Sequence, residues 1–96
     1  MSELPEGWDL DRVRAMGLAD ARLLPLDTLV LLERRDAARS DYDTLSPTAV
    51  LACGYDLCLV RNADDGLWYM GSPDGDGTIV CWGSYGDDLA EAIRGL

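Results

Sequence analysis

Residues 47–83 carry the feature that most constrains the fold, a series of short apolar runs separated by turn-forming residues. Such runs, bounded by Gly, Pro, Asn and Asp, are typical of β-strands joined by hairpins. The runs are Thr48–Cys53, Tyr55–Arg61, Leu67–Gly71 and Thr78–Gly83, and the turns are Asn62–Gly66 and Ser72–Gly77. Gly54 either separates two strands or marks a bulge within one long strand. The pattern predicts an antiparallel meander of three to five strands.

A helix is predicted toward each end of the chain. Asp9 is a suitable N-cap for a short amphipathic helix over 10–16, where apolar residues recur at helical spacing. Near the other end, Ser84 and Asp87 form a pair that resembles a capping box. The helix that follows places apolar residues on one face, which must pack on the sheet. These residues are Leu89, Ala92, Ile93 and Leu96.

The segment between the first helix and the meander is less regular. Leu18–Leu24 is ambiguous and is compatible with one more helical turn before Pro25. Leu26–Glu33 is apolar and partly β-branched, which favours a strand, with a helix as the alternative. Arg34–Ser46 is polar and is predicted to be a loop, long enough to be a candidate for function.

These elements predict a single α+β domain over residues 1–96: an antiparallel β-meander of three to five strands, with a short N-terminal helix and a C-terminal helix packed on the sheet. Both faces of the meander carry apolar side chains, and the helices can cover only about one face. The second face is therefore either covered by the N-terminal segment or left for a partner.

The chain contains no histidine, which excludes Ser–His and Cys–His dyads and imidazole metal ligands. It has 18 acidic and 8 basic residues, and its formal net charge is -10. Residues 41–96 hold ten acids and two arginines, so the second half carries most of this charge. Such a chain repels nucleic acid and anionic membranes and attracts basic proteins.

A cytoplasmic location is expected. No apolar run approaches the roughly 20 residues that span a membrane. The first residues are acidic, whereas a signal peptide begins with basic residues. The cysteines Cys53, Cys58 and Cys81 are therefore expected to be reduced and mostly buried, with no metal and no cofactor.

Other candidate sites have simpler explanations. The run 74–77 (DGDG) suggests calcium, but Thr78 and Tyr85 occupy positions where an EF-hand loop requires ligands. A hairpin turn explains the run better. Adjacent or near-adjacent carboxylates suggest an enzyme of the glycosidase or aspartic type, yet they fall at turns, in a polar segment and at a helix start, where solvated surface is expected. These carboxylates are Asp41 and Asp43, Asp64 and Asp65, and Asp87 and Asp88.

Aromatic residues cluster in the acidic half, where Trp68, Tyr69, Trp82 and Tyr85 are found. On strands such residues usually belong to the core, but Trp and Tyr are also favoured anchors of protein interfaces. We predict a partner surface in which carboxylates on the hairpin turns border the exposed part of a tryptophan. Its residues are Asp64, Asp65, Trp68, Asp74, Asp76 and Trp82. Asn at positions 64 and 65 is expected to slow association with a basic partner and to leave stability nearly unchanged.

Two motifs resemble small bacterial immunity proteins of polymorphic-toxin systems. They are the strand Gly66-Leu67-Trp68-Tyr69 and the helix start Asp88-Leu89-Ala90-Glu91-Ala92. The likeness spans Tyr55–Leu96, less than half of the chain, and does not assign one family. It implies a cytoplasmic, acidic inhibitor without enzymatic activity that blocks one toxin. The segment Arg34–Ser46 departs from the pattern, so no residue role is transferred.

Three functional hypotheses follow. The leading one is an acidic protein-binding inhibitor, an immunity protein or antitoxin that occludes a basic toxin. The second is a structural or regulatory interaction module, including a homo-oligomer formed through an uncovered sheet face. The third, and the weakest, is an enzyme that uses carboxylates.

Overall fold

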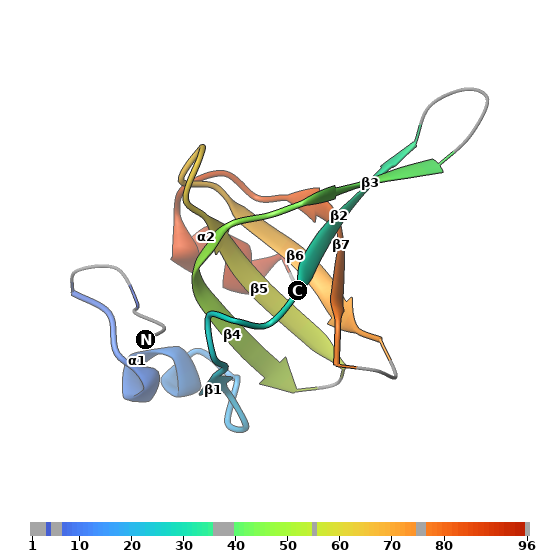
Figure 1. The fold of residues 1–96 in the computed structure, drawn as a ribbon. Helices are drawn as coiled ribbons and strands as arrows, with labels where there is room; N and C mark the ends of the chain where they lie inside the picture. The colour runs from blue at the N-terminus through green and yellow to red at the C-terminus, as the bar shows by residue number, and fades with distance from the viewer. Residues whose placement is uncertain (1–3, 5–6, 36–39, 55, 75–76, 96) are drawn as a thin grey trace.

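The computed structural model describes residue 4 and residues 7–35, 40–54, 56–74 and 77–95 (Figure 1). Within them the chain forms two short helices and a seven-stranded sheet. The elements are α1 (Leu10–Ala15), β1 (Arg22–Leu23), β2 (Val30–Arg35), β3 (Ser40–Thr44), β4 (Pro47–Gly54), β5 (Leu57–Asn62), β6 (Trp68–Pro73), β7 (Ile79–Ser84) and α2 (Leu89–Arg94). Neither described helix has the length and apolar character needed to cross a membrane.

The meander is confirmed, since β4, β5, β6 and β7 are consecutive antiparallel neighbours in the sheet. Gly54 adopts a φ of 82° and pairs with Leu57, so the chain reverses here and forms two strands rather than one bulged strand. Gly tolerates this left-handed conformation because it has no Cβ.

The sheet is larger than predicted, and it is mixed rather than purely antiparallel. Its order is β1-β4-β5-β6-β7-β2-β3, and β2 pairs with β7 in parallel. β1 is the first strand in this order and β2 is the last but one, so the chain passes from one end of the strand order toward the other between them. β2 therefore lies beside β7, a strand that comes later in the sequence, and the two strands run parallel.

Two predictions for residues 26–46 were wrong in part. The strand expected from Leu26 begins at Val30, because residues 26–28 form a turn in which the Thr28 N–H donates to the Pro25 carbonyl (3.2 Å). The loop expected over Arg34–Ser46 contains the end of β2 and all of β3, while residues 36–39 lie outside the described part of the chain. β3 is the last strand in the order and is rich in Asp and Ser, so its sequence lacks the apolar alternation of a half-buried strand.

Both predicted helices exist, although the second begins later than expected. Asp9 caps α1 by accepting a hydrogen bond from the Arg12 backbone N–H (2.8 Å). Ser84 is not the cap of α2, because strand pairing continues through it to the end of β7. The cap is Asp88, whose carboxylate accepts from the backbone N–H two residues later (2.9 Å).

The sheet curls strongly. β3 is last in the strand order and β4 is second, yet only Leu45 and Ser46 separate them in the sequence. The Leu45 N–H donates to the Val30 carbonyl on β2 (2.9 Å). The two ends of the sheet must therefore approach each other, and Figure 1 shows β3 leading into β4 along one continuous path.

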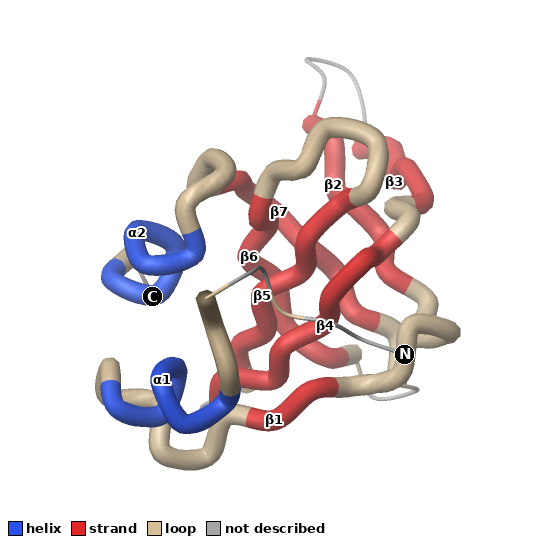
Figure 2. Tube along the Cα trace, turned by 90° about the vertical axis from the view of Figure 1, so that its left-hand side faces the viewer, coloured by secondary structure: helices blue, strands red, loops and turns tan. Residues whose placement is uncertain are grey.

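The curl divides the core into two clusters. The outer cluster lies between the sheet and the helices (Figure 2) and contains Val13, Ala21, Ala49, Leu51, Cys53, Leu59, Trp68, Leu89, Ala92 and Ile93. The inner cluster fills the concave face and contains Val30, Leu45, Val50, Cys58, Val60, Tyr69, Ile79 and Cys81. The second face of the meander is thus closed by the curvature of the sheet and by Leu24 and Leu26.

Candidate partner surface

The turn between β5 and β6 carries two of the predicted surface carboxylates, and they differ in role. Asp65 accepts hydrogen bonds from the Tyr69 hydroxyl (2.5 Å) and from the Leu67 backbone N–H (3.0 Å). The Tyr69 hydrogen bond is the main reason that the pKa of Asp65 lies below its usual range. Asp64 is exposed on the same turn.

Asp65 is therefore part of the fold as well as of the surface. Its hydrogen bond, together with burial, raises the pKa of Tyr69 to about 12. Tyr69 is buried in the inner cluster, so its hydrogen bond with Asp65 links the turn to the core. This contact changes the expectation for Asp65→Asn from a neutral to a destabilising substitution, because Asn cannot supply the same charge-assisted acceptor.

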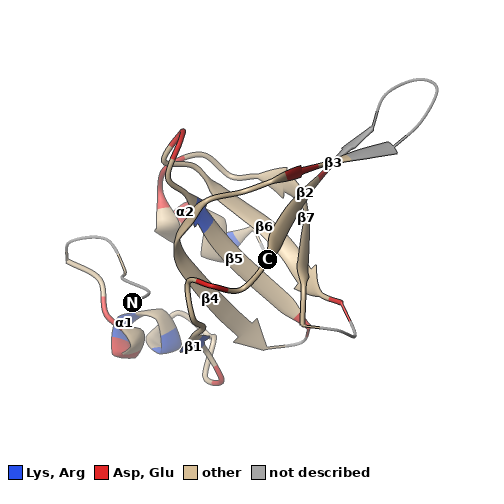
Figure 3. Cartoon of the chain, in the orientation of Figure 1, with Lys and Arg blue, Asp and Glu red and all other residues tan. Residues whose placement is uncertain are grey.

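The predicted carboxylates do not share one surface. Asp74 lies on the turn between β6 and β7, and Asp76 lies outside the described residues. Successive turns of a meander lie at opposite ends of the strand between them. β6 has six residues, a length of about 20 Å at 3.4 Å per residue. Figure 3 accordingly shows acidic residues on two well-separated turns.

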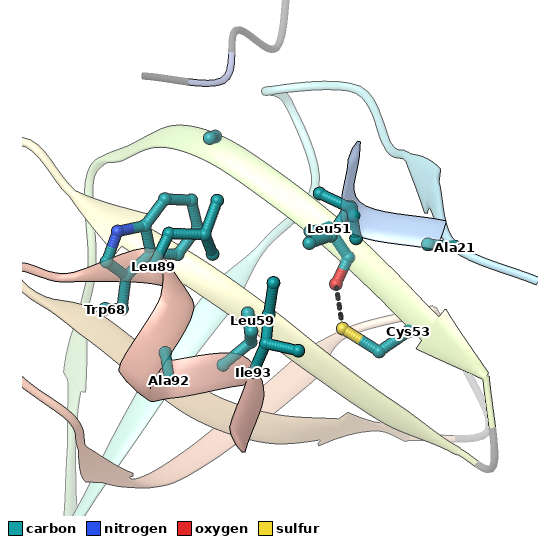
Figure 4. Close-up of a cluster of buried hydrophobic side chains, with 10 residues drawn as sticks. Ala21, Leu51, Cys53, Leu59, Trp68, Leu89, Ala92 and Ile93 are labelled. Atoms are coloured by element: carbon teal, nitrogen blue, oxygen red, sulfur yellow. Dashed lines mark hydrogen bonds between the residues drawn. The ribbon is translucent and has the colours of Figure 1, made fainter. Parts of the chain in front are cut away.

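Trp68 is not available to a partner. Its side chain has no exposed surface and packs in the outer cluster beneath α2, beside Leu89 (Figure 4). Among the described residues its Nε1 has no hydrogen-bond acceptor. Trp68 is therefore a core residue, and its inclusion in the predicted surface is corrected.

Trp82 is exposed, as the predicted surface requires, with 48% of its surface accessible. Met70 pairs with Gly83 and Gly71 pairs with Cys81, so Trp82 is the additional residue of a β-bulge on β7. The bulge depends on Gly71, because a Cβ there would lie 2.5 Å from the Val80 carbonyl oxygen. The sequence predicted neither the bulge nor its dependence on glycine.

Two other exposed large apolar residues were missed by the sequence analysis. They are Leu29 and Tyr42, with 50% and 55% of their surfaces accessible. Both lie in segments whose strand boundaries were predicted incorrectly. Knowing the correct register of β2 and β3 would have shown that these two residues are exposed.

The thiols are buried, as predicted, and are free. Burial raises the pKa of Cys53 and of Cys81 to about 12, and it also raises the pKa of Cys58. Within the described residues no group of three or more Cys, Asp or Glu side chains is placed to hold a metal ion. Protonated thiols of this kind are poor nucleophiles and poor ligands.

A basin of about 270 Å³ lies at the β1–β4 side of the sheet, with Asp20, Arg22, Asp56 and Cys58 among its lining residues. Two carboxylates and one guanidinium line this basin, so it is the candidate active site under the hypothesis of a carboxylate enzyme. Its mixed charge also fits an ordinary solvated surface.

Comparison of the chain with protein families, with curated proteins and with solved structures found no match.

Proposed function

We propose that the chain is an acidic protein-binding inhibitor, of the immunity-protein or antitoxin type, that occludes a basic toxin. The observation that carries the proposal is the placement of charge and exposed aromatic surface. The net charge of -10 sits mostly in the second half of the chain, and Asp64, Asp74 and Asp87 are exposed on turns there. Trp82 is exposed in the same half.

The mechanism is occlusion of a cleft. Carboxylates on the chain pair with Arg and Lys around the substrate site of the toxin, while Trp82 fills apolar space within it. The charges steer the encounter and raise the association rate, and the desolvated aromatic contact sets the lifetime of the complex. Tryptophans at the centre of an interface often contribute on the order of 2 kcal/mol or more when truncated to alanine.

The test is co-expression of this chain with a candidate toxin domain, sought among the products of neighbouring genes. Co-expression should restore growth of cells that produce the toxin. In stopped-flow measurements the association rate should fall steeply with added salt, since the Debye length shrinks from about 10 Å at 0.1 M to about 3 Å at 1 M. Growth that stays arrested, together with no association at low salt, contradicts the proposal.

The exposed apolar residues Leu29, Tyr42 and Trp82 also support the second candidate, an interaction module that self-associates. The inner face of the sheet is closed, so self-association would have to use another surface than that face. Sedimentation equilibrium separates this candidate from an inhibitor, because self-association makes the apparent mass rise with protein concentration.

A further inference from the structure

Five apolar side chains lie on the outer face of the three strands β7, β2 and β3. We name this set the Trp82 surface, and it consists of Leu29, Leu31, Tyr42, Val80 and Trp82. The three large apolar residues that are most exposed in the described part of the chain all belong to it. Leu31 and Val80 are partly exposed.

Strand alternation places these residues on one face. Val30, Ile79 and Cys81 point into the inner cluster, so their neighbours in sequence point outward. Leu31 pairs with Val80 across β2 and β7. On the other side of β2, Tyr42 pairs with Glu33, two residues beyond Leu31 and on the same face.

Nothing in the described chain covers this face. The outer cluster draws its sheet residues from β4, β5 and β6, and α2 packs on β6. None of the five residues belongs to either buried cluster. Figure 2 shows both helices on the other side of the view from β2 and β3.

The border of the Trp82 surface carries two carboxylates. Asp27 is exposed in the turn before Leu29, and Glu33 pairs with Tyr42 and lies on the same face. The chain as a whole is acidic, with a formal net charge of -10. In a two-fold symmetric dimer this border would meet its own copy, and like charges in opposition are destabilising. A partner with basic residues around apolar ones is complementary instead.

We propose that the Trp82 surface is the docking site for a basic protein segment that presents apolar side chains between lysines or arginines. This proposal rests on the proposed function and names the surface through which it would act. The apolar side chains of the partner cover Trp82, Leu31 and Val80, and its basic groups reach the acidic border. The turn carboxylates Asp64 and Asp74 then act only through long-range attraction.

The probe is an octapeptide of alternating leucine and lysine with blocked ends, compared with a serine–lysine and a leucine–glutamate octapeptide of the same length. NMR indole N–H signals report on Trp8, Trp68 and Trp82 separately after assignment with Trp82→Phe and Trp8→Ala. The leucine–lysine peptide should shift the Trp82 signal and leave the Trp68 signal in place. Equal shifts with the serine–lysine peptide would mean charge attraction alone and would overturn the proposal.

Matched variants locate the site. Trp82→Ala should weaken the leucine–lysine peptide about tenfold or more, the effect of a central interface aromatic. Trp8→Ala, at a half-buried tryptophan beside α1, should leave the affinity within about twofold. Asp27→Asn should weaken binding more than Asp11→Asn, which removes the same charge from the exposed side of α1. Equal effects within either pair would refute the location.

Sedimentation equilibrium completes the test. A monomer that binds the leucine–lysine peptide through Trp82 supports the proposal. A dimer that Trp82→Ala dissociates overturns it, because the occupant is then a second copy. Peptide binding at this surface without protection against a toxin would leave the docking site standing and reject only the inhibitor function.

Discussion

Ile93 offers a direct test of whether α2 is an essential part of the core. Its side chain is 5% exposed and lies in the outer cluster, in the group that Figure 4 shows with Leu51 and Leu59. Ile93→Ala removes three carbon atoms, worth about 2.4 kcal/mol at about 0.8 kcal/mol per buried group. A residual cavity adds to this loss, so a total of about 2–5 kcal/mol is expected.

The loss is large for a chain of this size. Domains of this length unfold with a free energy of roughly 5–15 kcal/mol, and each kcal/mol changes Tm by about 4–8 °C. A loss of about 3 kcal/mol therefore predicts a fall in Tm of roughly 12–24 °C. Urea unfolding followed by tryptophan fluorescence measures the same difference independently.

Glu91→Ala is the matched control. Glu91 is exposed on the same helix, so its truncation tests the helix without touching the core. Its effect should stay within about 0.5 kcal/mol. If Ile93→Ala and Glu91→Ala lower Tm equally, α2 is not packed as described.

The remaining predictions concern the turn, the bulge and the thiols. Asp65→Asn should destabilise the protein, whereas Asp64→Asn should not. Because folding lowers the pKa of Asp65, its contribution to stability is complete above the unfolded-state pKa and declines as the pH falls through the folded-state pKa. The urea midpoints of the two variants should therefore differ at pH 7 and converge toward pH 2. Gly71→Ala should unfold the protein or lower its Tm strongly, whereas Gly83→Ala, whose Cβ would meet nothing within 4 Å, should be well tolerated in the same thermal scan. The three thiols should react with Ellman's reagent only after denaturation, and rapid labelling of the native protein would show that the strands that bury them open readily.

The sequence predicted the meander and the helices because these elements bury apolar residues in a local pattern. β4 and β5 are apolar runs bounded by turn-forming residues, and Asp9 caps the start of α1. It failed for β3, whose polar residues have weak strand preference and gain their conformation by pairing with β2. The parallel pairing of β2 with β7 is a long-range choice that no local pattern encodes.

The prediction of the candidate site was wrong in part for the same reason, because it depends on contacts that no local pattern encodes. Asp64 and Asp74 are close in sequence, but β6 holds their turns at opposite ends of the sheet. Trp68 and Trp82 look alike in sequence, yet one lies beneath α2 and the other on a bulge. The difference follows from which strands α2 covers, and that depends on the completed fold.

The register of β2 changes how the acidity of the chain is interpreted. With a loop at Arg34–Ser46, Tyr42 would have no fixed position relative to Glu33 and Leu31. With β2 and β3 paired, Glu33 borders a fixed apolar face built from Leu31, Tyr42 and Trp82. A rigid apolar surface with an acidic border needs little ordering when a partner binds, and less of the contact energy is then lost to entropy. The apolar face sets the strength of such a contact, and the charge around it sets which partners approach.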